Sequence, residues 1–310
     1  MSNTNLGKIL VTGANGFLGS RFIKYLKRNG IQFDAVRNSN SGLHVNGSNY
    51  YNIDISKKKS LDILPLDYDC IVHLAARTGP GHIDNPLFDF EINALGTINL
   101  LDFARKSKIN KFVFASSSAI YGHNPGLNIT EEKVPNPNTP YALSKFTAEK
   151  YVNLYNELYE MENVVLRLFN IYGPSPLHMN SKGVISIIAD KILAGKSFDL
   201  TDSPNNLRDF VHIDDVVQAL SLSLFQSPPK KSIFNIGTGI GTSLMEIANL
   251  VIEMTGSSKD LINFNPDTLS SEFNSVANIE AAKKHLDYSS KVNIEKGISM
   301  LLEDLRSKRK

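Results

Sequence analysis

Thr12-Gly13-Ala14-Asn15-Gly16-Phe17-Leu18-Gly19 is the stretch of sequence that decides the fold class of this chain. It follows a short apolar run over 8–11, which predicts a β-strand, and it leads into 17–28, where apolar residues recur at the four-residue spacing of a helix. Its three glycines suit a tight turn, close approach of the backbone to a pyrophosphate, and close packing of the helix. The helix start offers free N–H groups to an anion. This strand–turn–helix unit therefore predicts a dinucleotide-binding fold.

Strand and helix patterns alternate through the first half of the chain. Such alternation predicts a parallel sheet covered on both faces, which is an α/β fold with a Rossmann-type, doubly wound sheet. The rhythm breaks after about residue 170, where a loop-like stretch over 173–183 leads into shorter, mixed elements. We expect an NAD(P)-binding domain over 1–170 and a smaller, mainly substrate-binding C-terminal lobe over 171–310, with part of 207–237 returning to the first domain. The expected strands cover 8–11, 32–36, 50–53, 70–74, 111–115 and 164–169, and the expected helices cover 17–28, 85–107 and 141–159.

The composition is that of an ordinary globular protein, with 42% hydrophobic and 21% charged residues. With 33 basic and 31 acidic residues, the net charge of +2 argues against a nucleic-acid partner, which needs a large basic excess. No apolar run approaches the roughly twenty residues of a membrane span, and we expect no signal peptide, no membrane partner and a cytoplasmic location. Cys70 is the single cysteine and the seven histidines lack metal-ligand spacing, so we expect no disulfide and no metal site.

The end of the second expected strand bears on the choice of cofactor. An acidic residue there would bond the ribose hydroxyls of NAD, but this chain has Arg37, followed by Asn38 and Ser39. Because a guanidinium pairs well with a 2′-phosphate, we expect NADP(H) to be favoured over NAD(H). The alternative is an exposed Arg37 that stacks on the adenine. Asp54, after the third strand, could accept from the adenine amino group or cap a helix.

Hydroxyl and amine side chains follow the fifth expected strand. Ser116-Ser117-Ser118 ends that strand, and Tyr141 and Lys145 come later, one helical turn apart on one face. A nearby ammonium stabilises an ionised phenol, and bringing a tyrosine pKa from near 10 to about 7 requires on the order of 4 kcal/mol. The lysine, a positively charged nicotinamide and a serine hydroxyl could supply this together. Tyr141 is therefore predicted to act as an acid/base near neutral pH.

Several further motifs occur in a fixed order along the chain. They are the glycine turn, Val72-His73-Leu74-Ala75-Ala76, Asn93, the serine run with the Tyr–Lys pair, Arg167 to Pro174, Arg208 to Val216 and Phe234 to Gly237. With these motifs the chain resembles the extended short-chain dehydrogenases/reductases, of the nucleotide-sugar epimerase/dehydratase group. The resemblance covers nearly the whole length and implies a nucleotide-sugar substrate.

The resemblance also implies roles for individual residues. Ser117 is the expected catalytic serine and Tyr141 the general acid/base, while Lys145 holds the nicotinamide ribose and lowers the tyrosine pKa. Ser118, Asn170 and Arg208 are expected to contact the substrate, with Arg208 on its diphosphate or, alternatively, in an ion pair with Asp209. The expected cofactor-binding residues are Gly13, Asn15, Gly16, Phe17, Leu18, Gly19, Arg37, Asp54, Ile55, Leu74, Ala75, Ala76, Asn93, Tyr141 and Lys145.

Two departures from the family pattern bear on the reaction and on the nucleotide of the substrate. Family dehydratases carry an acidic pair directly after the catalytic hydroxyl, whereas this chain has Ser118 and Ala119, which disfavours 4,6-dehydration. Many members also carry an arginine for the diphosphate near 270–274, where this chain reads Ser-Ser-Glu-Phe-Asn.

Three functions stay open. We favour an NAD(P)H-dependent reductase of a 4-keto-6-deoxy nucleotide sugar, because Arg37 suits a cofactor that is consumed and exchanged. The alternative is a 4-epimerase similar to UDP-glucose 4-epimerase, with tightly bound NAD. A remote alternative is a non-catalytic dinucleotide-sensing regulator on the same fold. Relatives often pair through two helices, so a homodimer through 85–107 and 141–159 is a further hypothesis.

Overall fold

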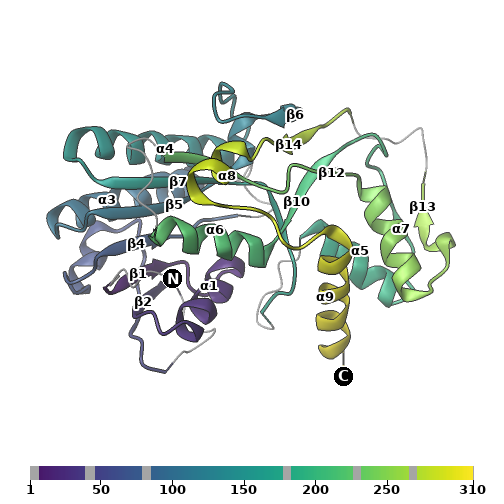
Figure 1. Ribbon diagram of the computed structural model, residues 1–310, viewed down its shortest axis with the longest axis horizontal. Helices are drawn as coiled ribbons and strands as arrows, with labels where there is room; N and C mark the ends of the chain where they lie inside the picture. Colours follow the sequence, from purple (N-terminus) through teal and green to yellow (C-terminus); the bar gives the residue numbers. More distant parts are fainter. Residues whose placement is uncertain are drawn as a thin grey trace.

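A seven-stranded parallel sheet forms the centre of the larger lobe (Figure 1). The computed structural model describes residues 7–38, 46–78, 85–176, 183–225, 232–264 and 271–309. In spatial order the strands are β11 (Ser232–Ile236), β7 (Glu162–Leu168), β5 (Lys111–Ser117), β4 (Cys70–His73), β1 (Ile9–Thr12), β2 (Phe33–Arg37) and β3 (Tyr50–Asn52). The chain begins in the middle of the sheet and winds outward in both directions, which is the Rossmann order. The predicted fold class is confirmed.

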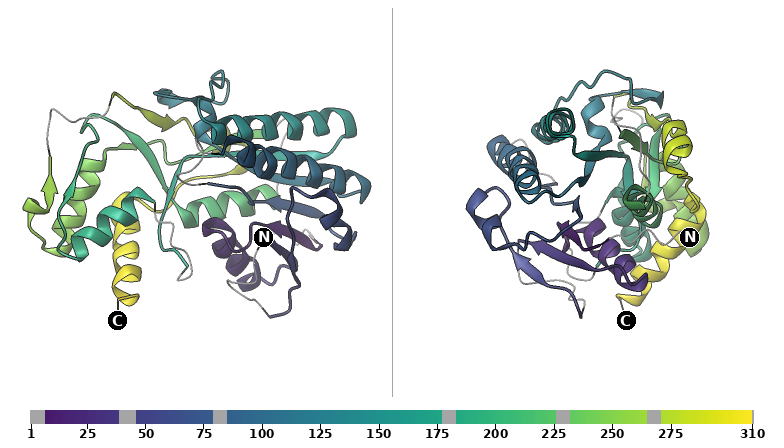
Figure 2. Two further views of the ribbon diagram at one scale, coloured as in Figure 1. Left: turned by 180° about the vertical axis from the view of Figure 1, so that it is seen from behind. Right: turned by 60° about the vertical axis from the view of Figure 1, so that its left-hand side comes forward.

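Helices cover both faces of this sheet, because alternate strand residues point to opposite sides. One face packs against α1 (Phe17–Arg28), α6 (Ile213–Phe225) and α8 (Glu280–Leu286). The other packs against α3 (Gly96–Lys106), α4 (Pro140–Tyr159) and the short η1 (Lys58–Ile63). Figure 1 has α1 and α6 in front of the sheet, and the view from behind in Figure 2 brings α3 and α4 forward.

A smaller sheet and three helices lie at the carboxyl ends of the central strands. The small sheet runs in the order β12 (Gly241–Thr242), β10 (Arg208–His212), β14 (Ser275–Ala277) and β6 (Gly126–Ile129), with β8 (Asn170–Tyr172) also paired to β10. A separate apolar core joins α5 (Val184–Leu193), α7 (Leu244–Thr255) and α9 (Ile294–Ser307) at one end of the molecule (Figure 1). The remaining short elements are β9 (Phe198–Asp199), which pairs with β13 (Ile262–Asn263), and the helical turn η4 (Lys259–Leu261).

Most expected elements are present, but the predicted helix over 85–107 is interrupted. It consists of α2 (Pro86–Asp89), a π-helical segment η2 (Phe90–Leu95) and α3. The wide turn of η2 carries Asn93 into the interior, where it is fully buried. The pattern of apolar residues does not reveal such a turn, because it depends on which backbone carbonyl each N–H reaches.

The order of the strands in space does not follow the order of the chain. β11 comes late in the sequence, yet it lies in the seven-stranded sheet beside β7, whereas β10 lies in the small sheet. The division of the chain at residue 170 stays a prediction. Residues 177–182 of the expected loop lie outside the described part of the chain.

Candidate active site

The glycine-rich turn joins β1 to α1 at the carboxyl edge of the sheet. Gly13 adopts a φ of 72°, which favours glycine, and a Cβ there would lie 2.5 Å from the backbone nitrogen of Ala75. A Cβ on Gly19 would lie 2.1 Å from the carbonyl oxygen of Gly13. Gly16 precedes α1, and the helix begins with no side-chain cap and no acidic residue in its first turn. The first N–H groups of α1 can therefore meet an anion, which fits the pyrophosphate of a dinucleotide.

A pocket of about 340 Å³ opens beside this turn. Its lining includes nine of the residues that the sequence predicted for the cofactor: Gly13, Asn15, Gly16, Arg37, Asp54, Ile55, Leu74, Ala75 and Ala76. The other lining residues are Asn38, which was noted beside Arg37, and Val36, Ile53 and Ile92, which the sequence reasoning missed. Val36 directly precedes Arg37, and Ile53 directly precedes Asp54. The expected ends of these two strands were therefore the sequence signal that could have identified Val36 and Ile53 as lining residues. Phe17, Leu18, Gly19, Asn93, Tyr141 and Lys145 do not line this pocket.

Arg37 and Asp54 occupy the side of the pocket expected to receive the adenosine. The Arg37 side chain is buried, and its guanidinium lies over the Tyr50 ring, 5.0 Å from the centroid. The exposed Arg37 of the alternative is therefore wrong, because β3 supplies an aromatic ring on which Arg37 packs. Asp54 accepts hydrogen bonds from the backbone N–H (3.1 Å) and hydroxyl (2.7 Å) of Ser56, which lower its pKa. Asp54 thus caps the following turn. Ser39 lies outside the described residues.

Asn93 was expected to contact the cofactor. Its side-chain oxygen accepts from the Arg77 backbone N–H (2.8 Å), and its amide donates to the Ser144 hydroxyl (3.0 Å). Asn93 is fully buried and connects the end of β4 to α4. Its side chain therefore serves internal hydrogen bonds in this structure.

Ser117 and Tyr141 are brought together from β5 and α4. Ser117 ends β5, and its hydroxyl accepts from the Ala119 backbone N–H at 3.2 Å. Tyr141 lies two residues after Thr139, whose hydroxyl caps α4 by accepting from the Ala142 N–H at 3.1 Å. Burial raises the pKa of the Tyr141 phenol, and its hydrogen bond with Ser117 opposes that rise. The predicted juxtaposition of the two hydroxyls is therefore present.

Lys145 lies one turn further along α4 and is almost completely buried. Its Nζ is 4.1 Å from the centroid of the Phe114 ring, and burial lowers its pKa to about 7. Burial is the largest cause of the pKa shift of both groups, and the lowering of the tyrosine pKa by Lys145 stays a prediction.

A buried ion pair supports α4 one turn after Lys145. Glu149 pairs with Arg167 of β7 (Oε1 to Nη2, 2.5 Å) and also accepts from the Ser116 hydroxyl at 3.0 Å. Arg167 donates in turn to the Tyr121 hydroxyl at 2.8 Å. Ser116 is therefore committed to this internal network, which leaves Ser117 and Ser118 of the serine run for the site.

The expected substrate residues lie on a helical turn after β5 and on two strands of the small sheet. Ser118 begins the helical turn η3 (Ser118–Tyr121). Asn170 donates to the backbone carbonyl of Asp209 at 3.1 Å. Arg208 forms an ion pair with Asp202 and lies over the Phe273 ring, 4.9 Å from the centroid. Asp209, the expected alternative partner of Arg208, instead accepts from the backbone N–H groups of Thr238 (2.8 Å) and Gly239 (2.9 Å).

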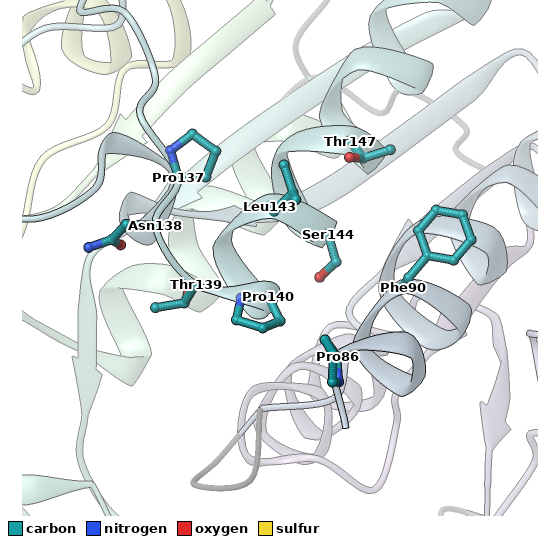
Figure 3. A pocket seen from close by; sticks show the side chains of 9 residues that line it. All are labelled: Pro86, Phe90, Pro137, Asn138, Thr139, Pro140, Leu143, Ser144 and Thr147. Carbon is teal, nitrogen blue, oxygen red and sulfur yellow. The ribbon is translucent and has the colours of Figure 1, made fainter. Parts of the chain in front are cut away.

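A second pocket, of about 580 Å³, lies between η2 and the start of α4 (Figure 3). It is lined by Pro86, Phe90, Pro137, Asn138, Thr139, Pro140, Leu143, Ser144 and Thr147. None of these side chains titrates, so this pocket provides no acid or base. Across the described ranges we find no cluster of three or more His, Cys, Asp or Glu side chains suited to a metal ion. Nor does any described helix have the length and apolar character needed to span a membrane.

The fold and this arrangement define a Rossmann-type α/β protein whose polar side chains meet at the carboxyl ends of its central strands. Residues 9–237 match the model of the NAD dependent epimerase/dehydratase family. The chain belongs to this family, as the resemblance predicted.

The relatives and solved structures that resemble this chain include UDP-glucose 4-epimerases. The chain is 39% identical over 250 residues to a putative UDP-glucose 4-epimerase of Methanocaldococcus jannaschii, across 78% of this chain and 81% of the relative. The UDP-glucose 4-epimerase of Thermotoga maritima, solved with UDP-glucose, has a TM-score of 0.89 and 29% identity, across 98% of this chain and 100% of that one. The UDP-glucose 4-epimerase of Thermus thermophilus, solved with NAD, has a TM-score of 0.84 and 30% identity, across 96% and 99%.

These comparisons correct two expectations. They favour the epimerase alternative over the reductase that the sequence reasoning preferred. They also favour NAD(H) over NADP(H), since the similar Thermus protein is an NAD complex. Both expectations depended on Arg37, which is buried against Tyr50.

Proposed function

We propose that this protein is a nucleotide-sugar 4-epimerase that acts on a UDP-hexose and retains NAD. The observation that carries the proposal is the pairing of Ser117 and Tyr141 at the carboxyl edge of a dinucleotide-binding sheet. The similarity to UDP-glucose 4-epimerases along nearly the whole chain supports the substrate class.

The cofactor would be held by the glycine turn and the neighbouring strand ends. Gly13 and Gly16 would take the pyrophosphate against the uncapped start of α1, and Ala75 and Ala76 would line its path toward Tyr141. When bound, NAD supplies a reversible hydride acceptor at carbon 4 of the sugar. Phe17, Leu18 and Gly19 would contribute the first turn of α1.

The chain's own side chains would then transfer one proton and orient the sugar. Tyr141, ionised to its phenolate, would take the proton of the sugar 4-hydroxyl and later return it as the neutral phenol, while the Ser117 hydroxyl bonds the same sugar oxygen. Burial raises the pKa of Tyr141, so ionisation requires compensating positive charge. The Lys145 ammonium on the ribose and the oxidised nicotinamide would provide that charge together.

The substrate would span the junction of the two lobes. We assign the diphosphate to Arg208, whose guanidinium is oriented by Asp202, and the sugar to Ser118 and Asn170. The same assignment supports a domain division at residue 170, with β11 returning to the large sheet, the cofactor on that sheet and the substrate against the small one.

The active unit would be a homodimer through α2, η2 and α4. This surface exposes large apolar side chains at Leu87, Phe90, Leu143, Leu154 and Leu158. An apolar stripe of this kind on two adjoining helices favours contact with a second copy.

The nucleotide that the purified protein retains tests the proposal. The protein is denatured, and the released nucleotide is identified and quantified by mass spectrometry. We expect near-stoichiometric NAD, because a cofactor recycled in place need not exchange. An empty protein that binds NADPH much more tightly than NADH would instead reinstate the reductase.

A further inference from the structure

A series of hydrogen bonds between buried side chains links the cofactor turn to the helix that carries Tyr141. At its first end, the Thr12 hydroxyl accepts from the Ala75 backbone N–H (3.2 Å) and contacts Nδ1 of His73 (2.7 Å). On the other side of the ring, Nε2 of His73 contacts the Thr97 hydroxyl at 2.9 Å. The Thr97 hydroxyl donates to the backbone carbonyl of Asn93 at 2.6 Å.

The series continues from Asn93 into α4. The Asn93 amide donates to the Ser144 hydroxyl (3.0 Å), which donates to the backbone carbonyl of Tyr141 (2.8 Å). The side chains of Thr12, His73, Thr97, Asn93 and Ser144 are each at most 3% exposed. Water therefore has little access to the bonds among Thr12, His73, Thr97 and Asn93.

The donors and acceptors fix the form of the imidazole. Because the single Thr97 hydroxyl proton goes to the Asn93 carbonyl, Nε2 of His73 must carry a hydrogen and donate. In a neutral ring Nδ1 is then the acceptor, and the Thr12 hydroxyl donates to it. The surroundings favour the neutral ring, since burial and the nearby Lys145 ammonium lower the His73 pKa.

The imidazole is also held by aromatic rings on the neighbouring strand. Its centroid lies 5.6 Å from that of Phe114 and 5.9 Å from that of Phe112. Phe114 is the ring over which Lys145 lies. His73 thus contacts, directly or through one residue, the end of β1, the π-helical segment and the environment of Lys145.

We propose that His73 is a positioning residue for the epimerase reaction. His73 accepts from Thr12 and donates to Thr97. Through Asn93 and Ser144 this bridge continues to α4, so it fixes the distance between the end of β1 and the first turn of α4. The role of His73 rests on the proposed function, because the spacing matters only if Tyr141 must meet a sugar held against the cofactor. Misplacement by about 1 Å can cost on the order of a hundredfold in rate.

The experiment compares Thr97→Val with Thr97→Ser in the NAD-loaded protein. Valine keeps the shape and removes the hydroxyl, whereas serine keeps the hydroxyl and removes a methyl group. We expect Thr97→Val to lower kcat for UDP-hexose interconversion about tenfold, with KM and bound NAD within about twofold of the unaltered protein. Thr97→Ser is expected to restore kcat to within about twofold.

Ser223→Ala is the matched control, because the Ser223 hydroxyl is equally buried but donates within α6, to the Ala219 carbonyl at 2.8 Å. It should reduce thermal stability without changing kcat. Equal kcat values for Thr97→Val and Thr97→Ser would overturn the positioning role, as would a Thr97→Val defect confined to KM.

Hydrogen exchange separates this role from the proposed function. Amides in the first turn of α4 should exchange about tenfold faster in Thr97→Val than in Thr97→Ser or Ser223→Ala. If the unaltered protein fails to interconvert UDP-hexoses, the proposed function is wrong. Faster amide exchange found in Thr97→Val alone would then still support the hydrogen-bonded bridge through His73. Equal exchange in all variants would reject it.

Discussion

Burial of Lys145 carries a cost for the stability of the folded protein. Its pKa is about 7 in the folded protein, against an ordinary value of 10.5. Below pH 7 the folded protein must keep an ammonium in a dry site, so the full cost is present. Between pH 7 and 10.5 the unfolded chain still binds the proton that the folded chain has lost, and the free energy of unfolding rises with pH.

Replacement of Lys145 by methionine should therefore stabilise the nucleotide-free protein. We expect a higher melting temperature for Lys145→Met, with the largest gain at pH 6 and a smaller gain at pH 9.5, measured by differential scanning fluorimetry. Lys150→Met is the control, because Lys150 is an exposed lysine on the same helix whose Nζ also lies over a ring, that of Phe146 at 5.0 Å. A gain for Lys145→Met that does not change with pH would contradict the burial argument.

At the scale of elements, two glycines of the turn between β1 and α1 are expected to differ in role. Gly19 allows close packing, whereas Gly16 is assigned to cofactor binding. Gly19→Ala would force a Cβ to 2.1 Å from the Gly13 carbonyl, so we expect a loss of about 1–3 kcal/mol in the free energy of unfolding. Gly16→Ala meets only the same oxygen at 3.1 Å. It should fold almost normally but bind NAD at least tenfold more weakly, because its methyl group occupies space meant for the pyrophosphate.

Calorimetric titration with NAD and thermal unfolding check this pair. Gly183→Ala is the control, since Gly183 precedes α5 with a φ of −63° and its nearest contact would be 3.9 Å away. Similar NAD affinity for Gly16→Ala and the unaltered protein would reject the pyrophosphate assignment.

The sequence predicted this turn, the Tyr141–Lys145 face of α4 and the meeting of Ser117 with Tyr141, because each depends on local spacing within one or two elements. It did not predict the π-helical segment or the stacking of Arg37 on Tyr50. The first depends on backbone hydrogen bonding and the second on the register between β2 and β3. The Asp202 partner of Arg208 was missed for a related reason, since the residue adjacent in sequence, Asp209, turns toward Thr238 and Gly239.

For the whole molecule, the apolar surface of α2, η2 and α4 bears on assembly. We expect the protein to sediment as a dimer at micromolar concentration. The double variant Leu154→Glu/Leu158→Glu should sediment as a monomer, because two carboxylates would have to be buried in the contact. Leu66→Glu changes another exposed leucine, away from these helices, and should leave the dimer intact. An unaltered protein that sediments as a monomer would contradict the proposed homodimer.

The central claim is that this protein interconverts UDP-hexoses at carbon 4 with a retained cofactor. The most direct measurement incubates it with UDP-galactose, without added nucleotide, and follows the appearance of UDP-glucose by anion-exchange chromatography. We predict conversion to an equilibrium mixture, and a loss of about 10²–10⁴-fold in kcat for Tyr141→Phe with NAD still bound. No conversion of UDP-galactose, together with stoichiometric oxidation of NADPH on a 4-keto-6-deoxy nucleotide sugar, would contradict it.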